Sequence, residues 1–210
     1  MKLKEMKEKT FALIEELYPE LSNLAEDEDV INKINGVVNS VQMDLMKFRK
    51  ITANTEINIE LNDDRIIDLK DYDDIYQVNR IILVPNEEDM VTTFNMIDNT
   101  TLEIDNSFAG TIRLYYYKYP TLCKTIFEAD DNETADEKRQ REDNRYVFEI
   151  DPMLLEIMPY GIARDLLRLD MISNYGSYFE RTYNDLIQRL DSRNTAGFIT
   201  IEGGIDLWVI

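Results

Sequence analysis

The side chains that could do chemistry in this chain are almost all carboxylates and tyrosines. Its 210 residues include 42 Asp and Glu, no histidine and one cysteine, Cys123. Without histidine the chain lacks the commonest general base, the Ser-His-Asp and Cys-His arrangements and most transition-metal sites. A lone cysteine excludes an internal disulfide and a multi-cysteine metal site, so we expect Cys123 to be a small buried hydrophobic residue.

Short acidic clusters are the candidates for a divalent-metal site. They are Asp63–Asp64, Asp71 with Asp73 and Asp74, and Asp130–Asp131. None has the spacing of a calcium-binding loop, so we interpret them as solvated turns. A carboxylate pair for glycoside hydrolysis stays open among so many acids, although nothing selects one pair. No glycine-rich phosphate loop occurs. The sequence therefore predicts no catalytic, cofactor-binding or metal-binding residues, and a protein that is not an enzyme and needs no cofactor.

The most distinctive stretch is GTIRLYYYKYP, residues 110–120, which has four tyrosines in five positions. Strand alternation puts Ile112, Leu114 and Tyr116 on one face, and we expect that face to lie in a core. The opposite face is amphipathic and suits a subunit or partner interface. Its candidate interface residues are Arg113, Tyr115, Tyr117 and Tyr119.

The tail, residues 194–210, contains a second candidate interface in the segment GFITI. Its residues are Phe198, Ile199 and Ile201. This segment could add as a strand to the sheet of a neighbouring subunit, or return to its own sheet, and both alternatives are open. Trp208 favours a docked end, since an uncovered Trp-Val-Ile would be an exposed apolar patch.

Net charge limits the partners. The formal charge is −19, with the largest part of the excess between residues 52 and 120. A negative field repels nucleic acid at range, and no Lys/Arg cluster offers a phosphate-binding footprint. We therefore expect no sequence-specific nucleic-acid binding. No apolar run has the length of a membrane helix, and the N-terminus lacks a signal-peptide core, so we expect no membrane partner and synthesis in the cytoplasm.

Apolar periodicity predicts helices at both ends of the chain. Residues 11–18 form one helical segment that ends at Pro19, and an acidic run at 26–29 opens a second helix of about 22 residues, with Lys47, Arg49 and Lys50 in its last turn. A helix starts at Asp151, as N-cap, with Pro152 at its first position, and Pro159 breaks or restarts it. A last helix follows SNYG, residues 173–176.

The middle of the chain alternates with the period of strands. EINIEL and RIIDL, around an NDD turn, predict a hairpin, residues 75–84 predict a longer strand, and residues 92–104 predict a second hairpin. Residues 128–145 are so polar that we expect an exposed loop or arm that packs against nothing.

The predicted fold is α+β, in which N- and C-terminal helices form a bundle and an antiparallel β-domain, a sandwich or small barrel, is inserted between them. The expected divisions are N-terminal helices (1–51), the β-domain (52–120), a charged arm (121–150), C-terminal helices (151–193) and a strand-like tail (194–210).

This order of elements resembles a tailed-bacteriophage head–tail connector, or adaptor, protein. The resemblance covers roughly residues 5–200 and rests on YYYKYP leaving a strand and on PYGIARDLL, residues 159–167, in the following helix. It implies a structural protein of the virion neck. About a dozen copies would form a homo-oligomeric ring under the portal protein, join capsid to tail or tail-completion proteins, and pass double-stranded DNA during ejection. The β-domain and the charged arm depart from the shortest, all-helical connectors.

Other hypotheses compete with this one. The chain could be another phage neck or tail-completion protein, an acidic protein that mimics DNA and occupies a host DNA-binding enzyme, or a divalent-metal hydrolase built on an acidic cluster. An acidic surface and the lack of catalytic motifs are compatible with the first two, and the hydrolase would need an activity that depends on Mg²⁺.

Overall fold

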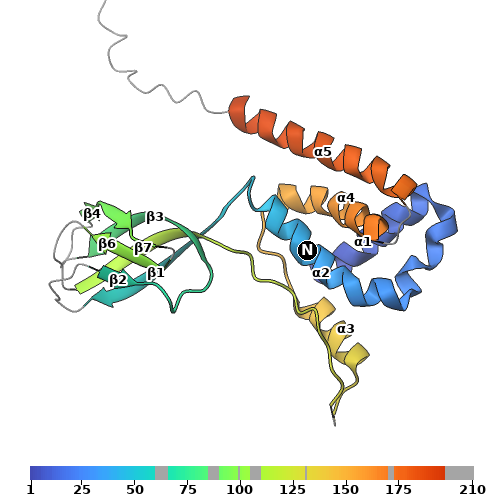
Figure 1. The fold of residues 1–210 in the computed structure, drawn as a ribbon, viewed down its shortest axis with the longest axis horizontal. Helices are drawn as coiled ribbons and strands as arrows, with labels where there is room; N and C mark the ends of the chain where they lie inside the picture. Colours follow the sequence, from blue (N-terminus) through green and yellow to red (C-terminus); the bar gives the residue numbers. More distant parts are fainter. Residues whose placement is uncertain are drawn as a thin grey trace, which may run out of the picture.

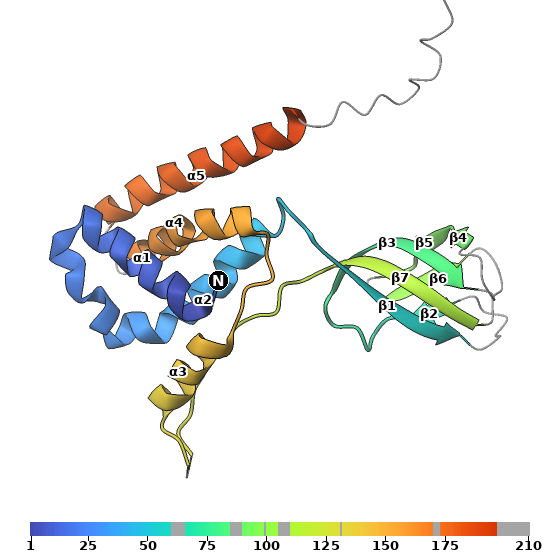
Figure 2. The same ribbon diagram turned by 180° about the vertical axis from the view of Figure 1, so that it is seen from behind.

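The computed structural model describes residues 1–59, 66–84, 90–98, 100–104, 110–130, 132–169 and 173–196. It contains a helical domain and a β-domain that projects from it (Figures 1 and 2). The helices are α1 (Leu3–Leu17), the 3-10 helix η1 (Pro19–Glu26), α2 (Glu28–Leu45), α3 (Ala135–Arg145), α4 (Pro152–Leu169) and α5 (Ser173–Ala196). The strands are β1 (Ile51–Ile59), β2 (Ile66–Asp68), β3 (Ile75–Val84), β4 (Met90–Thr92), β5 (Phe94–Met96), β6 (Thr101–Ile104) and β7 (Gly110–Lys118). The fold class is the α+β arrangement that the sequence predicts.

Helix α2 packs against α4, the helix that also contacts α1 and α5, and against η1. Asp27 caps α2 by accepting hydrogen bonds from the backbone N–H groups of Asp29 and Val30, as expected for an acidic helix start. Its apolar stripe is buried in a core to which α1, α4 and α5 also contribute residues. The predicted C-terminal end was wrong: α2 stops at Leu45, so Lys47, Arg49 and Lys50 follow the helix rather than forming its last turn. The chain turns there because strand β1 begins directly afterwards, at Ile51.

Helix α4 begins as the sequence predicts. Pro152 is its first residue, and the Asp151 carboxylate accepts a hydrogen bond from the Met153 N–H at 2.8 Å. The predicted break at Pro159 was wrong, because α4 runs through it. Proline removes one backbone hydrogen bond, but its neighbours Met158 and Ile162 are fully buried in the helical core, and this packing holds the helix together. SNYG also lies inside α5 rather than before it.

The β-domain is a two-layer sandwich. One sheet has the strand order β1-β7-β3-β4 and the other β2-β6-β5, all described pairs being antiparallel. Their facing sides share one core, which includes Ile67, Ile81, Leu102, Ile112 and Leu114. The described strands form two separate sheets, so the sandwich alternative holds and the barrel does not.

One predicted hairpin is confirmed and the other was wrong. β5 and β6, within the predicted 92–104 segment, pair as an antiparallel hairpin. β1 and β2, the two halves of the other expected hairpin, lie in different sheets: β1 pairs with β7 and β2 with β6. Short alternating segments identify strands but not their partners. Here β1 and β2 belong to different sheets, and the apolar faces of the two sheets meet in the core between them.

The predicted polar arm is largely helical. Helix α3 has a complete capping box, in which Thr134 and Glu137 bond each other's backbone N–H groups. It lies against α1 through Lys7, whose ammonium is 2.7 Å from an Asp143 carboxylate oxygen, with only 10% and 17% of the two side chains exposed. The expectation that this segment packs against nothing was therefore wrong, because a buried ion pair replaces the missing apolar contacts.

Candidate interaction surface of the β-domain

The tyrosine-rich strand β7 lies between β1 and β3, so its two faces meet different surroundings. Ile112 and Leu114 are fully buried and Tyr116 is 6% exposed. These three residues form part of the sandwich core, as the alternation predicts. Burial, aided by the nearby Asp74 carboxylate, raises the pKa of Tyr116.

The other face of β7 forms the middle of an outer surface, here called the tyrosine face. Cross-strand pairing sets its rows. Glu56 lies opposite Arg113, Tyr115 lies between Asn54 and Arg80, and Tyr117 lies between Thr52 and Gln77. The structure therefore brings together three of the predicted interface residues, Arg113, Tyr115 and Tyr117, at the centre of the four-stranded sheet. In Figures 1 and 2 no helix covers the β-domain.

Cations lie over the tyrosine rings of this face. The Arg80 guanidinium is 4.7 Å from the Tyr115 ring centre, and the Lys50 ammonium is 4.6 Å from that of Tyr117 and 5.6 Å from that of Tyr76. Lys50 also donates a 2.7 Å hydrogen bond to the Gln77 amide oxygen. Such contacts stabilise exposed cations by about 0.5–1 kcal/mol each, so they hold these side chains flat against the sheet.

Arg113 is neutralised by a neighbour. Its guanidinium donates two hydrogen bonds to one Glu56 carboxylate oxygen, at 3.0 and 3.2 Å. These bonds, with a smaller contribution from Tyr115, raise the pKa of Arg113. Beside this pair, the Thr111 hydroxyl donates to the Asn58 amide oxygen at 2.8 Å.

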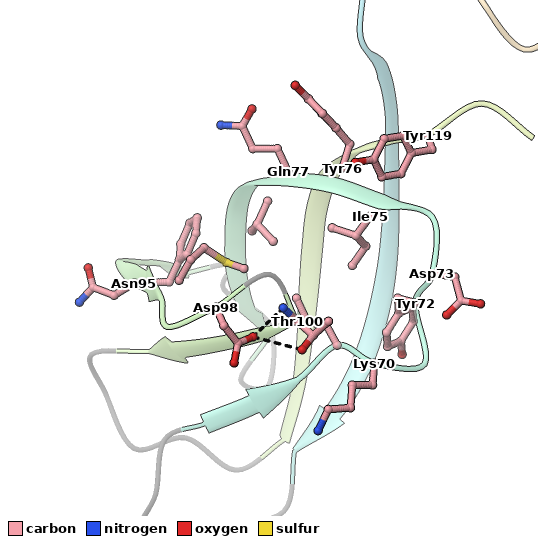
Figure 3. Close-up of a pocket in the computed structure, with 14 residues that line it drawn as sticks. Lys70, Tyr72, Asp73, Ile75, Tyr76, Gln77, Asn95, Asp98, Thr100 and Tyr119 are labelled. Carbon is pink, nitrogen blue, oxygen red and sulfur yellow. Dashed lines mark hydrogen bonds between the residues drawn. The ribbon is translucent and has the colours of Figure 1, made fainter. Parts of the chain in front are cut away.

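Tyr119 follows the end of β7, beyond the paired rows of the tyrosine face. Its N–H donates to the Asp74 carbonyl at 2.7 Å, and its ring meets the Tyr76 ring edge-on with centres 5.2 Å apart. Both rings line an open cleft of about 720 Å³ between the start of β3 and the β5–β6 hairpin, shown in Figure 3. Tyr119 therefore lies at the margin of the tyrosine face, in contact with Tyr76, rather than in its central rows.

The polar groups of this cleft are engaged in local structure. Asp98 accepts hydrogen bonds from the N–H and hydroxyl of Thr100, drawn as dashed lines in Figure 3, and these bonds lower its pKa. Lys70 is ion-paired with Asp68 at 2.9 Å. The cleft therefore has aromatic and polar walls but no described constellation of groups for catalysis.

The other predicted residues are distributed as follows. Phe198, Ile199 and Ile201, with the rest of 197–210, lie outside the described residues, as do Asp63–Asp64 and Asp131. Asp130 caps a turn by accepting from the N–H groups of Asn132 and Glu133, and together with Lys138 these bonds lower its pKa. Within the ranges that the structure describes, no three His, Cys, Asp or Glu residues lie close enough to hold a metal ion.

Cys123 is buried, as the sequence predicts. It lies in an extended segment that polar side chains of α2 hold in place. The Asn39 side chain bonds both backbone groups of Cys123, at 2.8 and 2.9 Å, and Asn35 donates to the Lys124 carbonyl at 2.6 Å. Burial raises the pKa of the thiol to about 12.

Sequence reasoning missed Lys50, Tyr76 and Arg80. Arg80 belongs to a predicted strand, but the register of β3 against β7 shifts between Ile75 and Gln77 and again between Val78 and Arg80. Val78 and Ile81 therefore share the core although they are an odd number of residues apart, and alternation along β3 gives no single face for Tyr76 and Arg80. Lys50 precedes β1, where alternation does not apply.

Comparison with known protein families gives no match, and a search of curated proteins finds no related sequence. Among the described helices, none has both the length and the apolar composition that crossing a membrane requires.

Proposed function

We propose that this chain is a structural head–tail connector of a tailed bacteriophage, acting without catalysis. In this role several copies form a ring under the portal, join the capsid to the tail and pass double-stranded DNA. The observation that carries the proposal is the architecture: a β-sandwich inserted between N- and C-terminal helices projects from the bundle (Figure 1). The outer face of its larger sheet carries tyrosine and charged side chains.

The charge of the chain supports the same role. A formal charge of −19 disfavours adhesion of the phosphate backbone, so DNA can pass a ring of such subunits without being held. The tyrosine face has the composition of a protein interface, since tyrosine and arginine are enriched there. Three of the four residues predicted for it, Arg113, Tyr115 and Tyr117, lie in β7, which is hydrogen-bonded on both sides and presents them on a rigid support.

The test is assembly on a portal ring. The full chain is mixed with the purified portal protein encoded in the same genome, and the product is imaged by electron microscopy. We expect an added ring layer on one end of the portal, with the tail-completion protein binding below it. A chain that leaves portal rings unchanged at every concentration would contradict the proposal, and binding to a host DNA-binding enzyme in competition with DNA would favour the mimic.

A further inference from the structure

The tyrosine face carries positive charge on a strongly acidic protein. Lys50 and Arg80 are both exposed, and each lies over a tyrosine ring. Among the described residues neither has a carboxylate partner: the contacts of Lys50 are the Gln77 amide and two rings, and the contact of Arg80 is the Tyr115 ring. The chain has 42 acidic and 23 basic residues, yet this face carries two exposed cations without a described carboxylate partner.

A matching negative surface lies at the far end of the helical domain. The stretch from Thr10 to Asn32 contains seven acidic residues and no lysine or arginine. All seven side chains are exposed, and they are Glu15, Glu16, Glu20, Glu26, Asp27, Glu28 and Asp29. We call this surface, at the end of α1, along η1 and at the start of α2, the acidic end. One of its carboxylates, Asp29, is paired with Lys33 at 3.9 Å.

The two surfaces lie at opposite ends of the molecule. In both ribbon views the β-domain and the η1 region are at the two extremes of the long axis of the described fold (Figures 1 and 2). A chain cannot bring them together within itself, whereas two copies can meet head to tail. Such a heterologous contact generates a ring when the rotation between copies closes, and a filament when it does not.

We propose that the tyrosine face of one copy binds the acidic end of a second copy. Lys50 and Arg80 supply the attraction and Tyr115 and Tyr117 the contact area. Charge complementarity favours a second copy as the partner. Two acidic ends repel each other, whereas the tyrosine face offers cations to the acidic end of another copy. This inference rests on the proposed function only in that the ring there is the expected product.

Charge reversal at each surface tests the contact. The face variant is Lys50→Glu with Arg80→Glu, and the end variant is Glu26→Lys with Glu28→Lys, which leaves the cap residue Asp27 in place. The matched control for the face variant is Lys4→Glu with Arg181→Glu, which makes the same change in net charge at exposed helical positions. Circular dichroism confirms folding, and sedimentation velocity of the full chain without portal measures self-association at low and high salt.

Each variant alone is expected to self-associate about tenfold or more weakly than wild type, while the control stays within about twofold. An equimolar mixture of the face and end variants should recover association, because each copy then meets its opposite charge at both contacts. Wild-type association should weaken as salt rises.

Several results would overturn the inference. A wild-type chain that stays monomeric at low salt up to its solubility limit, a face variant that associates as wild type does, or a mixture that fails to recover would each do so. Tight binding of a labelled oligothymidylate, lost in the face variant alone while self-association is unchanged, would assign the face to single-stranded nucleic acid instead. If mixing the face and end variants recovers association but neither the wild type nor any variant binds the portal ring, the contact between copies is supported and the connector role is contradicted.

Discussion

Gly161 lies where three helices of the bundle meet, and its substitution tests that packing. A Cβ atom added at Gly161 would lie 2.7 Å from a ring carbon of Tyr183 on α5 and 2.8 Å from a methyl carbon of Val41 on α2. Carbon atoms pack best at about 3.5–4.0 Å, so both neighbours would have to move. Neither can move freely: Val41 is fully buried, and the Tyr183 ring is 3% exposed, with the Arg164 guanidinium 4.5 Å from its centre.

Gly36 supplies the matched control. It lies in α2, and a Cβ added there meets nothing within 4 Å. Gly36→Ala should therefore stabilise the protein by about 1 kcal/mol through helix propensity alone. Gly161→Ala gains the same propensity and adds an overpacking cost of about 1–3 kcal/mol, so the two variants should differ by about 2 kcal/mol.

The assay is urea unfolding followed by far-ultraviolet circular dichroism, which reports mainly on the helices. The expected order of stability is Gly36→Ala, wild type, Gly161→Ala. If Gly161→Ala proves as stable as Gly36→Ala, α2, α4 and α5 are not packed at this junction as described, and the reasoning fails.

Two further predictions concern buried polar groups. Asp143→Ala leaves the buried Lys7 ammonium without its partner and should lower the free energy of unfolding by about 2–3 kcal/mol. The control Glu156→Ala removes an exposed partner of Lys9 and should lower it by less than about 1 kcal/mol. Equal losses in urea unfolding would argue against the packing of α3 on α1. Burial raises the pKa of the Cys123 thiol and of the Tyr146 and Tyr183 hydroxyls to about 12, compared with usual values of 9.0 for cysteine and 10.0 for tyrosine. The stability that these protonated groups contribute is therefore complete below about pH 9 and is lost as pH rises toward 12. Thermal melts between neutral and high pH should show that loss, and Cys123 should react with a thiol reagent only as the protein unfolds; rapid labelling of the native protein would refute the burial.

The fold class could be predicted because its signals are local. Apolar spacing in α2 and alternation in β7 each predict which side chains face a core, and those side chains are buried in the structure. Strand partners could not be predicted, because β1 pairs with β7 across more than fifty residues of sequence and the pattern of neither strand identifies its partner. The helix over 135–145 was hidden by its polarity, because a capping box and several ion pairs stabilise it rather than an apolar stripe.

The tyrosine face was predicted in part for the same reason. Alternation within β7 separates Tyr115 and Tyr117 from the core residues between them. The cations over their rings come from Lys50, before β1, and from Arg80, beyond a bulge in β3, and only the folded sheet brings them to one face. Alternation does not predict the position of Tyr119, because this residue lies past the last paired residue of β7.

The connector role is tested most directly by the mass of the assembly that this chain forms with a portal ring. Sedimentation of the wild-type chain is measured alone and with a substoichiometric amount of purified portal rings. The proposal predicts a single added species in which about a dozen chains bind each portal ring, with excess chain left unbound. A portal that sediments unchanged, or that binds chains without a fixed number, would contradict it.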